Sequence, residues 1–110
     1  MSTLVVEQEL AVRGVVVTPD TLSVELSDGR SLSVPLGWFP RLLHGTPGER
    51  ARWELIGRGS GIHWPELDED ISLEGLLAGR SSGESQQSLD RWLKTRKPRQ
   101  ANKRIRRTPR

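Results

Sequence analysis

The chain has 110 residues with 17 basic side chains, 14 acidic side chains and a formal net charge of +3. This length suits one small domain, and no apolar run approaches the length of a membrane-spanning helix. The chain has no cysteine, which excludes disulfides, thiolate metal ligands and cysteine nucleophiles.

The first predicted elements are three β-strands. Residues 11–18 are rich in valine, and residues 22–26 and 32–36 alternate apolar with polar side chains. Asp28-Gly29, between the second and third strands, is a strong hairpin signal. We therefore predict an antiparallel sheet that begins with these segments.

The length of the hairpin loop decides which residues pair. A two-residue loop would place apolar residues opposite serines. A three-residue loop, 27–29, instead pairs Val24 with Leu32 and Leu22 with Val34, and puts its glycine where a bulge needs a left-handed conformation. We predict the three-residue loop, because a slip of one residue would turn a whole apolar face outward.

Short helices and strands follow in the middle of the chain. Residues 38–43 predict one or two helical turns, and Thr46-Pro47-Gly48-Glu49 is typical of a helix start with a capping box. Residues 53–56 and 62–64 are predicted strands. The glycine-rich segment 57–61 joins them as a turn, because a phosphate-binding loop would instead open a helix after a strand.

Two helices are predicted after residue 70. A short one is capped by Ser72 and ended by Gly79. A second capping box, Ser81 with Glu84, opens a helix of about three turns, and Pro98 ends it.

These elements predict an α+β fold. A small antiparallel sheet built from β-hairpins combines with short helices, and a C-terminal helix and a basic, disordered tail follow. We divide the chain into a body (1–80), a linker with an amphipathic helix (81–97) and a basic tail (98–110).

The charges are strongly separated along the chain. Residues 94–110, called the basic segment below, carry nine positive side chains and no negative one. Residues 1–93 therefore hold eight basic and 14 acidic side chains, a formal charge of −6. Because the basic segment has no interleaved aromatic residues, we expect phosphate contacts with DNA or RNA rather than base reading. The basic segment could instead bind acidic protein surfaces. Alternatively, it serves only as a solubilising tail. The predicted nucleic-acid-binding residues are Lys94, Arg96, Lys97, Arg99, Lys103, Arg104, Arg106, Arg107 and Arg110.

The four tryptophans have two expected roles. Trp38, Trp53 and Trp64 are expected in the core or at its rim. Trp92 lies on the only apolar face of an otherwise polar helix, and this face either packs on the body or binds a protein. The predicted partner-binding residues are Leu89, Trp92 and Leu93.

Polar residues of the body suggest no reaction. Asp68, Glu69 and Asp70 follow His63 and could bind a divalent cation, but adjacent carboxylates rarely converge on one ion, and helix capping accounts for them. His63 and His44 have no partnered nucleophile. We therefore expect no catalytic residues, no metal site and no cofactor.

Three segments together resemble a known family. They are LSVELSDGRSLSVPL, WFPRLLHGTPGERARWEL and GSGIHWPELDEDISLEGLLAG. Over about residues 11–79 the chain resembles the bacterial family called domain of unknown function 2442. The resemblance implies a compact α+β fold with no established activity or cofactor. It also implies gene arrangements similar to toxin–antitoxin pairs, and some members carry a helix-turn-helix segment for which 80–110 is too short.

We therefore expect a non-catalytic regulatory or interaction module in the cytoplasm. Its body would bind a protein partner, for which the resemblance suggests a toxin-like protein, and its basic segment would bind nucleic acid. One alternative is a subunit or inhibitor of a nucleic-acid-processing complex, with the acidic body acting as a phosphate mimic. Another is a small metal-dependent hydrolase that uses His63 and Asp68 to Asp70. No membrane contact is expected, and the sequence leaves the oligomeric state open.

Overall fold

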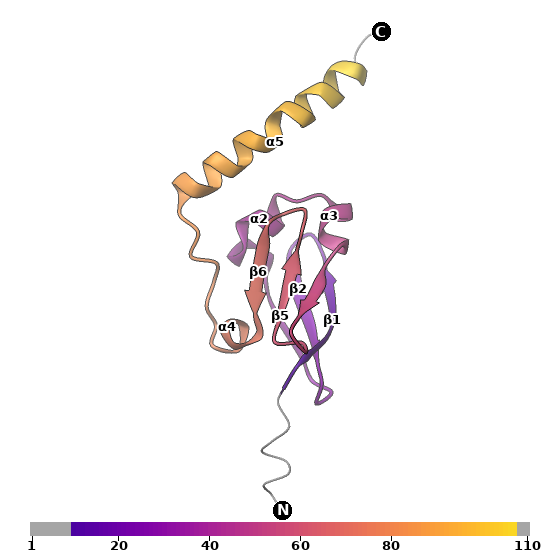
Figure 1. The fold of residues 1–110 in the computed structure, drawn as a ribbon, viewed down its shortest axis with the longest axis vertical. Helices are drawn as coiled ribbons and strands as arrows, with labels where there is room; N and C mark the ends of the chain where they lie inside the picture. Colours follow the sequence, from indigo (N-terminus) through magenta and orange to yellow (C-terminus); the bar gives the residue numbers. More distant parts are fainter. Residues whose placement is uncertain (1–9, 108–110) are drawn as a thin grey trace, which may run out of the picture.

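The computed structural model describes residues 10–107, with side chains described within residues 10–96. Two three-stranded antiparallel sheets, in the orders β1-β2-β3 and β4-β5-β6, combine with short helices and one long C-terminal helix (Figure 1). The predicted α+β class is confirmed. The elements are β1 Val12–Val17, β2 Thr21–Leu26, β3 Ser31–Pro35, the 3-10 helix η1 Leu36–Trp38, α2 Pro40–Leu43, α3 Pro47–Ala51, β4 Glu54–Ile56, β5 Gly61–Trp64, β6 Glu69–Ser72, α4 Leu73–Leu77 and α5 Gln86–Arg107.

The hairpin of β2 and β3 has the predicted register. Leu22 pairs with Val34 and Val24 pairs with Leu32, as the three-residue loop requires. Gly29 has a φ of +94°, a left-handed conformation in which an L side chain would be strained. The loop and the alternation of apolar residues therefore select the same pairing.

The turn between β4 and β5 also joins the two sheets. The Val12 amide of β1 donates a hydrogen bond to the Gly59 carbonyl oxygen at 2.8 Å. Gly59 has a φ of +93°, and a Cβ on it would lie 2.7 Å from the Val12 carbonyl oxygen. The predicted turn is confirmed, and this close approach is a second reason for glycine at position 59.

The predicted helix caps of α3 and α4 are also confirmed. The Thr46 hydroxyl accepts the Glu49 amide at 3.1 Å, and the Glu49 carboxylate accepts the Thr46 amide at 2.9 Å. The Ser72 hydroxyl accepts the Gly75 amide at 2.9 Å. Each cap satisfies backbone N–H groups that a helix start leaves without an intrahelical partner.

Strand β6 was absent from the sequence prediction. It pairs with β5 through Ile62–Ile71, His63–Asp70 and Trp64–Glu69. Acidic residues have low strand propensity, so the segment read as the approach to a helix. Here the pairing with β5 and the burial of Ile71, which is 4% exposed, outweigh that propensity.

One apolar core receives side chains from both sheets and from the short helices. Trp64 is fully buried, and its indole N–H donates to the Arg50 carbonyl oxygen at 3.0 Å, which satisfies its one polar group. Trp38 and Trp53 are half-buried against this core. The predicted place of the three tryptophans, in the core or at its rim, is confirmed. The largest fully buried side chains are Trp64, Leu22, Leu36, Leu42, Ile62, Leu67, Val12 and Val24.

Helix α5 differs from the prediction at both ends. It begins at Gln86, where the Ser85 hydroxyl accepts the Ser88 amide at 3.0 Å, so the predicted capping box of Ser81 and Glu84 is wrong. The Glu84 carboxylate instead accepts hydrogen bonds from Arg41 of the body and from the Ser88 hydroxyl.

The predicted end of α5 at Pro98 is also wrong. The helix continues to Arg107 and crosses the predicted boundary between residues 97 and 98. A proline removes one backbone N–H from a helix, but good helix-forming residues on both sides favour its continuation. Within residues 10–107, no helix combines the length and apolarity needed to cross a membrane.

Candidate functional site

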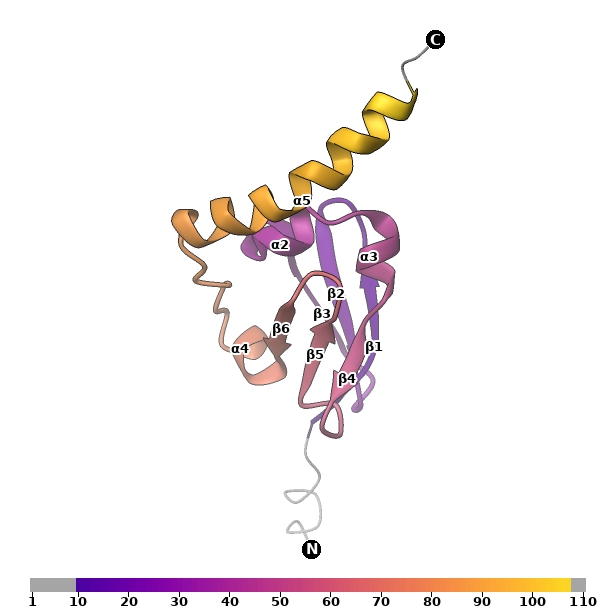
Figure 2. The ribbon, with the colours of Figure 1, turned by 45° about the horizontal axis from the view of Figure 1, so that its top comes forward.

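The first half of α5 is docked on the body. Leu89, Trp92 and Arg96 recur at helical spacing and face it, with Leu89 7% exposed and Arg96 6% exposed. Trp92 packs against the core, and Leu93 beside it is half-buried. The apolar face predicted to bind a partner is thus largely covered by the chain's own body. In Figure 2 this half of α5 lies over α2, and the second half extends past the body.

Arg41 of α2 anchors the segment that leads into α5. Its guanidinium binds both carboxylate oxygens of Glu84, with the shortest contact at 2.7 Å between Nη2 and Oε2. Its Nη1 also donates to the Asp68 carbonyl oxygen at 3.2 Å. The side chains of Arg41 and Glu84 are 16% and 9% exposed, so water screens this pair only weakly. The hydrogen bond from Arg41 lowers the pKa of Glu84, and the same bond raises the pKa of Arg41.

A second ion pair anchors α5 about three turns further along the chain. Arg96 donates to the two oxygens of Glu49 at 2.7 and 3.1 Å, and Glu49 is the residue that completes the capping box of α3. The hydrogen bond from Arg96 lowers the pKa of Glu49 to about 2, against the opposing effect of burial. Arg96 is one of the residues predicted to bind nucleic acid. In the structure its guanidinium is buried and paired with Glu49.

Trp92 lies between these two anchors along the helix. The guanidinium carbons of Arg41 and Arg96 lie 5.1 and 4.7 Å from the centre of its ring. Contacts of this kind are each worth about 0.5–2 kcal/mol, more when water is excluded. Trp92 and the two ion pairs therefore form one docking interface that fixes the direction of α5.

The other predicted nucleic-acid-binding residues lie at or beyond the edge of this interface. Lys94 is exposed. Arg110 lies outside the described residues. Helical backbone carries Lys97, Arg99, Lys103, Arg104, Arg106 and Arg107. The basic segment is therefore attached to the body through the docked half of one continuous helix.

Glu69 is a polar residue at a core-facing position, which the sequence analysis missed. On β6 it lies on the same face as Ile71 and pairs with buried Trp64 on β5. Burial raises its pKa to about 7; the charge of Arg41 opposes this, and Glu84, Asp70 and Asp68 add to it. Glu69 lies two residues before Ile71, so a prediction of strand β6 would have placed both side chains on the same face.

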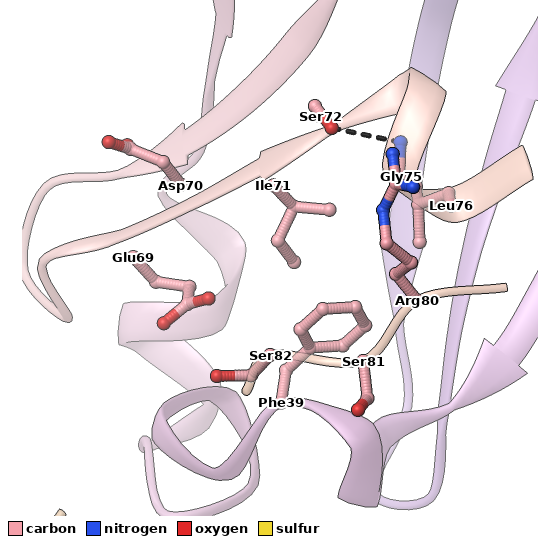
Figure 3. A pocket seen from close by; sticks show the side chains of 10 residues that line it. All are labelled: Phe39, Glu69, Asp70, Ile71, Ser72, Gly75, Leu76, Arg80, Ser81 and Ser82. Atoms are coloured by element: carbon pink, nitrogen blue, oxygen red, sulfur yellow. Dashed lines mark hydrogen bonds between the residues drawn. The ribbon is translucent and has the colours of Figure 1, made fainter. Parts of the chain in front are cut away.

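Glu69 borders a small pocket between β6, α4 and the linker to α5 (Figure 3). The pocket has a volume of about 180 Å³. Phe39, Ile71 and Leu76 supply its apolar surface, and Arg80 and the hydroxyls of three serines its polar surface. The serines are Ser72, Ser81 and Ser82.

The acidic residues considered for a metal are directed apart by the fold. Glu69 faces the core, whereas Asp70 faces outward and is hydrogen-bonded to His63 on the neighbouring strand. This bond raises the pKa of His63. Asp68 lies in a turn with a φ of +52°. Among residues 10–107, no group of three or more histidines and carboxylates lies close enough to hold a metal ion.

The architecture is that of a small α+β domain, with two antiparallel sheets around one core and a C-terminal helix. The chain belongs to the family described as Protein of unknown function (DUF2442), whose model matches residues 12–82. The expected family is confirmed. The matched region ends before α5, so the docked helix and the basic segment lie outside it.

Two solved structures are similar to this chain. One is a protein of unknown function from Rhodospirillum rubrum, with 26% identity and a TM-score of 0.60 over 70% of this chain and 95% of that one. The other is an uncharacterized protein from Chromobacterium violaceum, with 26% identity and a TM-score of 0.59 over 74% of this chain and 76% of that one. No curated protein matches the chain.

Proposed function

We propose that this protein is a non-catalytic interaction module that holds nucleic acid with its basic segment and a protein partner with its acidic body. The observation that carries the proposal is the docked helix α5, which joins the basic segment to a body of opposite charge through buried ion pairs. A helix fixed in this way directs the basic segment to one side of the molecule, where it can follow a phosphate backbone.

The ion pairs narrow the set of residues proposed to contact nucleic acid. The Arg96 guanidinium forms an ion pair with Glu49 inside the protein. The residues proposed to contact phosphates are therefore Lys94, Lys97 and the bases beyond Pro98. Since the segment has no aromatic residues, these contacts give affinity without base sequence preference, and DNA and RNA are both suitable ligands.

The acidic body supplies the second half of the proposal. A toxin-like partner is suggested by the family resemblance, and such a pair would act in the cytoplasm, which agrees with a chain free of cysteine. In this arrangement the protein would bring its partner to nucleic acid, as an operon regulator or within a nucleoprotein assembly.

The test is a binding titration with a short DNA duplex and with RNA at several salt concentrations. We compare the full-length protein with Lys103→Gln/Arg104→Gln in the basic segment. If both bases contact phosphates, the slope of log K against log salt falls by about 1.8. The matched control, Arg13→Gln/Arg58→Gln, removes two exposed bases of the body and should leave the slope unchanged. Equal losses in both variants, or no binding by the wild type, would overturn the proposal.

A further inference from the structure

The pocket beside Glu69 has the size of a single side chain. Its volume of about 180 Å³ is below the range of about 300–1,000 Å³ that is usual for sites of larger ligands. It opens at the surface between β6, α4 and the linker, and Figure 3 shows Ile71 and Phe39 between Glu69 on one side and Arg80 on the other. The lining is mainly polar, with a small apolar area between Glu69 and Arg80, so an occupant needs a polar end and a narrow stem.

The Glu69 carboxylate lacks a hydrogen-bond donor among the described residues. Arg41, whose charge acts on Glu69, already binds Glu84 and the Asp68 carbonyl oxygen. A partly buried carboxylate without a donor is costly, and alternation along β6 holds it at the core-facing position because Ile71 must be buried. A donor cation entering the pocket would supply the missing partner.

The remaining walls suit the stem of a basic side chain. Phe39 and Ile71, 3% and 4% exposed, offer a small apolar surface against which the methylene stem of a lysine or arginine can lie. Arg80 on the opposite side repels a cationic head and so directs it toward Glu69. The net charge of the protein around the pocket also favours a cationic occupant, since residues 1–93 have a formal charge of −6.

We propose that this pocket receives a lysine or arginine side chain of a protein partner, with its cationic head on the Glu69 carboxylate. The inference rests on the proposed function, because it specifies how the body recognises its partner. It assigns the contact to the body, at a site separate from the basic segment.

The experiment uses the full-length protein and mimics of the two side chains. Butylammonium and butylguanidinium are titrated while backbone amide shifts are followed by NMR, with butanol and butyrate as neutral and anionic probes of similar size. We expect saturable shifts at residues 69–72 and 81–82 with the two cations. We also expect saturating butylguanidinium to lower the pKa of Glu69 by about one or more, as a close opposite charge does.

Glu69→Gln should weaken binding of the cations at least about tenfold, the loss of one close charge pair. The neutral amide removes a partly buried charge and keeps the shape of the side chain, so this variant is expected to fold. Glu74→Gln is the control, since it removes one exposed carboxylate that does not line the pocket, and it should bind like the wild type.

Three results would overturn the inference. They are butanol shifts as large as those of the cations, shifts spread over carboxylates throughout the body, and full binding by Glu69→Gln. The first two need only the wild-type protein. The nucleic-acid titration is independent of all three, so failure of the pocket and failure of the basic segment are separable.

Discussion

Glu49 makes two contacts that depend on each other. Its carboxylate closes the capping box with Thr46 and also binds Arg96 of α5, so the start of α3 and the docking of α5 share one side chain. The Arg96 Nε is buried without a hydrogen-bond partner in the described structure, which makes the guanidinium more dependent on Glu49. Removing one member of a buried pair leaves the other charge uncompensated, and this usually costs more than the pair contributes.

Glu49→Gln should therefore destabilise the protein by about 2–3 kcal/mol at pH 7, measured by urea denaturation. Glutamine keeps the geometry of the capping box, so the loss reports the ion pair with Arg96. The pKa of Glu49 in the folded protein, about 2, lies below the ordinary value of 4.5. Its contribution is thus complete above pH 4.5 and is lost as the pH falls toward 2, and the difference between variant and wild type should shrink over that range.

The control for this prediction is Glu66→Gln. Glu66 binds Arg52 at 2.7 Å, but both side chains are well exposed, so the substitution should cost less than about 1 kcal/mol. A loss in Glu49→Gln as small as in this control would show that the buried pair contributes no more than a surface pair.

At the scale of elements, the sequence predicted those parts whose local signals agree with their surroundings. The β2–β3 hairpin is one, because the loop glycine and the alternation of Leu22 and Val24 independently indicate one register. The cap of α3 is another. Both are determined by residues within a few positions of one another, so neither depends on knowing the rest of the fold.

The elements that the sequence predicted wrongly depend on contacts between residues far apart in the chain. Strand β6 contains two acidic residues, and only the neighbouring β5 and the core pocket for Ile71 make it a strand. The start of α5 was misplaced because Glu84 pairs with Arg41, 43 positions away in sequence. The candidate site depends on such distant contacts. The sequence predicted that Trp92 packs on the body or binds a partner, but it revealed neither the ion pair of Arg96 with Glu49 nor the partial burial of Glu69.

The docking of α5 can be tested at Trp92. Trp92→Ala removes the ring that contacts the core, Arg41 and Arg96, and for this half-buried side chain we expect a loss of about 2–3 kcal/mol. Because the central core does not include Trp92, the body should remain folded. Hydrogen exchange should then show lost protection in residues 86–96 and retained protection in β2 and β5.

Arg91→Ala is the matched control for this substitution. Arg91 precedes Trp92 on α5 and is exposed, so its removal should change protection little. If Trp92→Ala kept the protection of residues 86–96, the two ion pairs alone would suffice to dock the helix.

At the scale of the whole molecule, the basic segment acts next to a body that carries the same sign of charge as nucleic acid. Residues 1–93 have a formal charge of −6, so their field opposes the approach of a phosphate backbone. The docked half of α5 keeps that body at a fixed place relative to the start of the basic segment. Salt screens the repulsion over about 10 Å at 0.1 M and about 30 Å at 0.01 M. The body should therefore restrain binding at low salt and have little influence at physiological salt.

Neutralising part of the body should then strengthen nucleic-acid binding in low salt. We expect Glu25→Gln/Glu54→Gln/Glu74→Gln, which removes three exposed negative charges, to raise the affinity for a short duplex on the order of threefold at 0.01 M salt. The increase should disappear by about 0.15 M, where the charges are screened. The corresponding substitutions to aspartate keep the charge and should leave the affinity unchanged. Equal affinities for the glutamine variant and the wild type at 0.01 M would mean that the basic segment binds beyond the reach of the body's field.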